Sequence, residues 1–70
     1  MTINADKLVR MGEQITDNMR YTDDEAVVAA KVAEHLGKFW DPRMQDAIIR
    51  YAAQADAELS KTLRAAIALL

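Results

Sequence analysis

A junction between two helices lies in the stretch His35-Leu36-Gly37-Lys38-Phe39-Trp40-Asp41-Pro42-Arg43-Met44. Asp followed by Pro is a strong signal for a helix start. The Asp carboxylate accepts backbone N–H groups of the first turn, and Pro at the first helical position loses no hydrogen bond. One helix is therefore expected to end near Trp40 and another to begin at Pro42. The same ten residues contain the only His, Phe, Trp and Pro of the chain.

Helix starts are also predicted on both sides of this junction. Asn4 and Ser60 are suitable caps, and Thr22 precedes Glu25 by three residues, which is the spacing of a capping box with the Thr hydroxyl as cap. Apolar residues recur at spacings of three and four after each start, which is typical of amphipathic helices. We expect a single all-α domain over residues 1–70, a small bundle of three to four short helices at about 5–19, 23–40, 42–53 and 61–69.

The second helix is expected to have an unusually wide apolar surface. Phe39 and Trp40 are neighbours in sequence, so on a helix they continue two different apolar lines about 100° apart. Two interpretations follow. Either this helix is central and touches several neighbours, or one line packs internally while the other docks on a partner protein, where Trp and Arg are common anchors.

Arg43 and His35 are the two further candidate functional residues in this stretch. Arg43 is expected to point away from the apolar stripe of its helix, either into solvent, or in an ion pair with Asp46, or toward a carboxylate or carbonyl groups of a partner. His35 has no Ser, Cys or pair of carboxylates at a recognisable catalytic spacing. We therefore expect no enzymatic activity from this chain.

Composition limits the remaining possibilities. The 70 residues contain no Cys and one His, which argues against disulfides, protein-ligated iron–sulfur clusters and zinc sites. A net charge of −2 with scattered Lys and Arg argues against nucleic-acid binding, and isolated Gly residues give no phosphate-binding loop. No apolar run approaches the roughly 18 residues of a membrane span. We expect a cytoplasmic protein that does not bind a membrane and has no cofactor or small-molecule substrate of its own.

The junction resembles the signature of the delta subunit of NAD-dependent, molybdenum- or tungsten-containing formate dehydrogenases, which carry a similar His-x-x-x-Phe-Trp-x-Pro-Arg-Met run. Upstream, Met11-Gly12-Glu13-Gln14-Ile15 is similar to the first-helix segment of that family, so the resemblance covers about residues 7–50. The family also has a joint after its third helix. Helix propensity alone would allow residues 54–59 to continue the third helix, but the resemblance implies a break, and we expect one.

The resemblance implies an accessory subunit that docks on the large pterin-containing catalytic subunit and stabilises the assembled enzyme. The residues expected to bind the partner are His35, Phe39, Trp40, Asp41, Pro42, Arg43 and Met44. Two alternatives remain open at this point. One is a maturation chaperone, present only during cofactor insertion into that enzyme, and the other is an unrelated helical module that associates with itself.

Overall fold

A computed structural model describes residues 4–20 and 22–70, and in this part of the chain all regular secondary structure is helical. The helices are α1 (Ala5–Asn18), α2 (Glu25–Phe39), α3 (Pro42–Ala52) and α4 (Lys61–Ala68). The predicted all-α fold is confirmed. Each helix ends one residue earlier than expected, and α1, α3 and α4 begin at the expected residues. None of the described helices is long and apolar enough to cross a membrane.

The start of α2 corrects the predicted capping box. The N-cap is Asp24, whose Oδ1 accepts from the backbone N–H groups of Ala26 and Val27 at 3.1 and 3.4 Å. Thr22 accepts instead from the N–H of Asp24. Glu25 does not reach back to the cap, because its Oε1 accepts a 2.7 Å hydrogen bond from the hydroxyl of Thr62 in α4. The helix therefore begins two residues later than expected.

The other three helices begin at the predicted caps. Asn4 accepts from the N–H groups of Asp6 and Lys7, and Asp41 caps α3. Ser60 Oγ accepts from the N–H of Leu63 at 3.1 Å. The expected break also lies between α3 and α4, which are separated by residues 53–60 without a helix.

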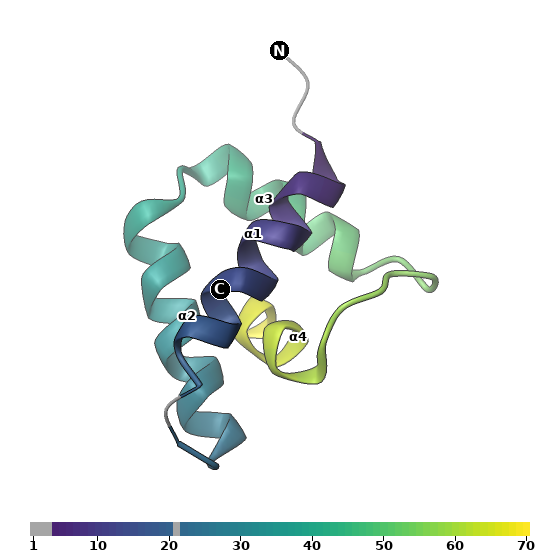
Figure 1. Cartoon of the computed structure of the whole chain (residues 1–70). Coiled ribbons are helices and arrows are strands. Elements are labelled where there is room, and N and C mark those ends of the chain that lie inside the picture. The colour runs from purple at the N-terminus through teal and green to yellow at the C-terminus, as the bar shows by residue number, and fades with distance from the viewer. Residues whose placement is uncertain (1–3, 21) are drawn as a thin grey trace.

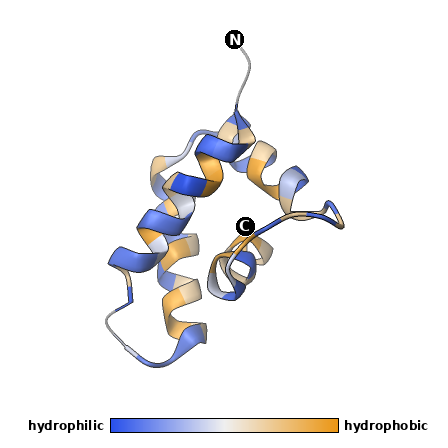
Figure 2. Cartoon of the chain, turned by 45° about the vertical axis from the view of Figure 1, so that its right-hand side comes forward, coloured by the Kyte–Doolittle hydropathy of each residue, from blue (hydrophilic) through white to orange (hydrophobic). Residues whose placement is uncertain are grey.

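The helices pack around one apolar core, in which α2 and α4 form the most extensive pair and α1 contacts each of the other three (Figure 1). Figure 2 shows a mainly hydrophilic outer side of α1 and a largely hydrophobic α2. Removing the apolar side chains of the core from water is the main favourable contribution to folding in a chain of this size. The buried apolar residues are Leu8, Val28, Ala29, Val32, Leu36, Trp40, Ile48, Leu63, Ala66 and Ile67.

Candidate functional site

The backbone turns from α2 into α3 within two residues, at a place we call the corner (residues 35–44). Trp40 ends α2 in an extended conformation, and its N–H donates to the carbonyl of Leu36 at 3.0 Å. Asp41 Oδ1 then accepts from the N–H groups of Arg43 and Met44 at 2.9 and 3.0 Å. Each helix end is thus capped by the residue that adjoins it, almost without a loop, which fixes the direction of the chain.

Gln45 adds a cross-link that the sequence analysis missed. Its Nε2 donates to the carbonyl of Trp40 at 2.8 Å and lies 3.4 Å from that of Leu36. The carbonyl of Trp40 lies past the end of α2, where backbone acceptors lack helical partners, whereas that of Leu36 already accepts from the N–H of Trp40. The sequence did contain a signal for this cross-link. Only two residues separate the two helices, so a side-chain amide one turn into α3 comes within reach of the end of α2.

Trp40 and Met44 belong to the inner side of the corner. The Trp40 side chain is only 6% exposed and is part of the apolar core, and Met44 is half-buried against that core. In the free chain, Trp40 is therefore an internal residue and not one that is available to a partner. Its indole anchors the corner to the rest of the molecule.

Phe39 lies on the outer side and is 71% exposed, the highest exposure among the large apolar side chains of the described residues. Its ring contacts the half-buried imidazole of His35 in a tilted arrangement, with the centroids 4.7 Å apart. The apolar line that starts at the buried residues Val28 and Val32 therefore leaves the core at His35 and ends in solvent at Phe39.

Arg43 is exposed in the first turn of α3. The ion pair with Asp46 that the sequence allowed is absent from the described part of the chain, because Asp46 pairs with Arg50, Nε to Oδ2, at 3.0 Å. The guanidinium of Arg43 is thus presented to solvent beside Pro42.

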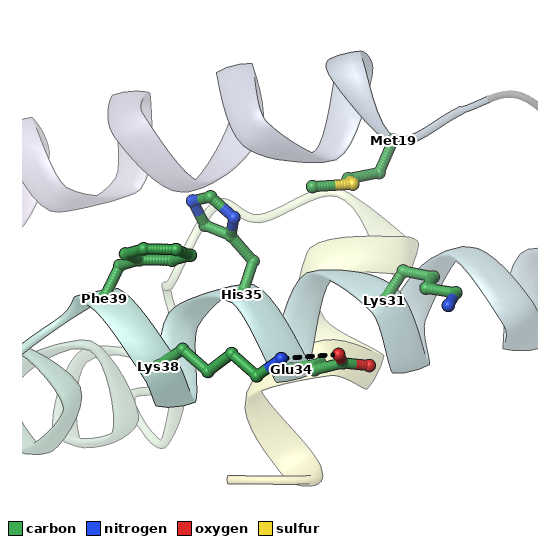
Figure 3. A pocket seen from close by; sticks show the side chains of 6 residues that line it. All are labelled: Met19, Lys31, Glu34, His35, Lys38 and Phe39. Carbon is green, nitrogen blue, oxygen red and sulfur yellow. Dashed lines mark hydrogen bonds and ion pairs between the residues drawn. The ribbon is translucent and has the colours of Figure 1, made fainter.

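A cleft of about 140 Å³ opens beside the corner, between α1 and α2 (Figure 3). Lys38 Nζ lies 3.0 Å from Glu34 Oε1 on its rim. This hydrogen bond, followed by the charges of Lys38 and Lys31, lowers the pKa of the Glu34 carboxyl below its ordinary value. The residues that line the cleft are Met19, Lys31, Glu34, His35, Lys38 and Phe39.

All seven residues predicted to bind a partner lie in the corner, but Trp40 and Met44 face the core rather than the surface. The exposed residues are Phe39, Asp41, Pro42 and Arg43. His35 and Met44 are half-buried, and Trp40 is buried. Among the described residues, no group of three or more His, Cys, Asp or Glu side chains could hold a metal ion.

These features define a small all-α protein with a capped corner that presents an aromatic ring and a guanidinium to solvent. The chain belongs to the family of NADH-dependent formate dehydrogenase delta subunits, FdsD, whose model matches residues 7–67. The match extends beyond the resemblance found in residues 7–50 and includes most of α4. No curated protein and no solved structure matches the sequence.

Proposed function

We propose that this chain is a non-catalytic accessory subunit of a cytoplasmic NAD-dependent formate dehydrogenase, and that it docks on the large molybdopterin- or tungstopterin-containing subunit through the corner. The observation that carries this proposal is the 71% exposed ring of Phe39 on a tightly capped corner, in a chain of the delta subunit family. The cofactors and the chemistry would belong to the partner subunits.

Phe39 and Arg43, which are exposed on the two sides of the connection between α2 and α3, suit a protein interface. Aromatic residues and Arg are enriched among the side chains that dominate binding energy, because they combine a large contact area with a defined orientation. Phe39 offers the apolar area, and Arg43 offers a planar fork that can bind a carboxylate or carbonyl groups. Because Trp40 is fixed in the core, the backbone that carries both would lose little conformational entropy on binding, and the entropic cost would fall on the two side chains.

Such docking would stabilise the enzyme by mass action. A subunit that binds only the folded, cofactor-loaded large subunit shifts its unfolding equilibrium, by an amount that grows with the concentration of the free chain relative to its dissociation constant. The role requires no reactive group in this chain. It requires a surface whose geometry is set before binding, which the short connection between α2 and α3 would supply.

The test is coexpression of the full chain with a tagged large subunit, with Arg43→Ala and Arg50→Ala as matched variants. Both arginines are exposed on α3, but Arg50 lies outside the corner. We expect stoichiometric copurification of the wild type and of Arg50→Ala, and a loss of roughly 2 kcal/mol or more of binding for Arg43→Ala. We also expect the formate-dependent reduction of NAD to survive heating longer when the wild-type chain is bound.

Other outcomes would replace this function. Binding to the cofactor-free large subunit, followed by release from the loaded enzyme, would identify a maturation chaperone. Failure to bind in either state, together with a stable homo-oligomer of the isolated chain, would identify a self-associating helical module.

A further inference from the structure

The cleft between α1 and α2 continues the corner onto a second element. Phe39 and His35 form one end of it, and Met19, at the C-terminal end of α1, lies on the other side (Figure 3). The His35 ring points toward α1 and the Phe39 ring lies next to it. The exposed aromatic ring is therefore one wall of a concave surface, rather than an isolated side chain on a convex one.

The size of the cleft suits one apolar side chain. Its volume of about 140 Å³ is similar to that of a cavity of about 150 Å³ that accommodates benzene in another protein. The Phe39 ring, the half-buried Met19 and the tilted imidazole of His35 form its apolar part. A Leu-sized or Phe-sized group is of the right dimensions to fill this space and to cover the exposed face of Phe39.

The rim carries a positive excess in a chain that is negative overall. Two Lys side chains and one Glu line the cleft, whereas the whole chain has a net charge of −2. Glu34 is already paired with Lys38 at 3.0 Å. Lys31, on the same side of α2, leaves one positive charge unbalanced within the cleft lining, and a negatively charged group would be favoured there.

We infer that this cleft binds a segment of the large catalytic subunit in which a Leu-sized or Phe-sized apolar side chain is next to an Asp or Glu. The apolar side chain enters between Phe39 and Met19, and the carboxylate lies at Lys31. This inference rests on the proposed function and identifies the chemistry that the partner presents to it.

A second copy of this chain is a poorer occupant on the same observations. In a two-fold symmetric contact the same patch meets itself, so each positive rim would face the other. Like charges brought together at an interface weaken binding, and in this way they disfavour an incorrect partner. The charge of the cleft thus favours an acidic, apolar segment from a different protein.

The experiment measures the affinity of the full chain for the purified, cofactor-loaded large subunit by biolayer interferometry. Phe39→Ala removes the apolar wall, and Lys31→Glu reverses the rim charge without touching the core. The matched controls lie on α4 and away from the cleft: Leu69→Ala, whose side chain is 62% exposed, and Lys61→Glu, which changes the net charge equally. Circular dichroism of each free variant checks that its helices are intact.

We expect Phe39→Ala to weaken binding by about 30-fold or more, and Leu69→Ala to leave it within about two-fold. Lys31→Glu is expected to weaken binding several-fold at low salt and less at high salt, while Lys61→Glu has the smaller effect at both.

If the wild type binds but both cleft variants behave as their controls do, the cleft is not the site and the inference is overturned, although the proposed function stands. If the wild type does not bind, the proposed function itself fails. A dimer of the isolated chain that Phe39→Ala dissociates would overturn the inference in favour of a second copy.

Discussion

Glu13 of α1 caps the start of α4. Its carboxylate accepts a 2.6 Å hydrogen bond from the hydroxyl of Ser60 and a 3.0 Å hydrogen bond from the backbone N–H of the same residue. In a capping box the second acceptor comes from three residues along the same helix. Here it comes from 47 residues away, so the cap also joins the first and last helices.

We expect Glu13→Ala to lower the free energy of unfolding by about 1–3 kcal/mol, because it leaves half-buried donors at Ser60 without their charged acceptor. Urea denaturation measures this change. Gln14→Ala is the control, since Gln14 is the exposed neighbour in the same helix. Equal midpoints for the two variants would show that the Glu13 carboxylate contributes nothing to stability.

Substitutions of Trp40 and Phe39 are expected to differ strongly in their effect on stability, although the two residues are adjacent. Trp40→Ala empties part of the core and should cost roughly 3–5 kcal/mol, comparable to the whole stability of such a small domain. Phe39→Ala changes a side chain that is 71% exposed, and should alter the free energy of unfolding by about 0.5 kcal/mol or less. Chemical denaturation followed by circular dichroism compares the two. A Trp40→Ala variant that unfolds at the same midpoint as Phe39→Ala would be incompatible with the observed core.

At the helix start itself, Asp41 should matter more than Pro42. Asp41→Ala leaves the N–H groups of Arg43 and Met44 without their acceptor, at a typical cost of about 1 kcal/mol. Pro42→Ala only increases the freedom of the unfolded chain and should cost less. Asp41→Asn is the matched control, because Asn caps a helix about as well as Asp. The explanation fails if Asp41→Asn is as destabilised as Asp41→Ala.

The sequence predicted local features well, because these depend on residues close together in the chain. The caps Asn4, Asp41 and Ser60 act within three residues of themselves, and all three are found as expected. Burial was also predictable where helical spacing determines it, as in α4, whose buried residues include Leu63, Ala66 and Ile67.

Apart from the hydrogen bonds of Gln45 to the end of α2, the errors and omissions concern partners distant in sequence. Glu25 was expected in a local capping box, but it accepts from Thr62, 37 residues away, and the nearer carboxylate of Asp24 takes over the cap. No helical pattern indicates which carboxylate meets which hydroxyl across a bundle. The cleft beside Phe39 could not be predicted for the same reason, because its shape depends on how Met19, at the end of the first helix, lies over the second helix.

Glu34 offers a test of the charges on the rim of the cleft. Its pKa is lowered mainly by the hydrogen bond from Lys38 and then by the charges of Lys38 and Lys31. A carboxyl whose pKa is lower in the folded than in the unfolded state stabilises the fold when the pH is above its unfolded-state pKa. This contribution is lost as the pH falls through its folded-state pKa. We expect an NMR titration to place the Glu34 pKa below the ordinary value for Glu, and Lys38→Gln to raise it. A Glu34 pKa that does not change in Lys38→Gln would mean that the ion pair is not formed in solution.

The two glycines should respond differently to the same substitution, although both lie inside helices and neither has a positive φ. A Cβ at Gly37 meets nothing within 4 Å, so Gly37→Ala should raise the free energy of unfolding by about 0.5–1 kcal/mol, through the lower conformational entropy of the unfolded chain. A Cβ at Gly12 lies 3.2 Å from both Cδ atoms of Leu63, which is fully buried in α4. Leu63 would have to move by a few tenths of an ångström in a close-packed core, and this cost opposes the gain in helix propensity. We therefore expect Gly12→Ala to stabilise the chain less than Gly37→Ala or to destabilise it. Equal increases in the midpoint of urea denaturation would show that α1 and α4 do not approach as closely at Gly12 as the structure indicates.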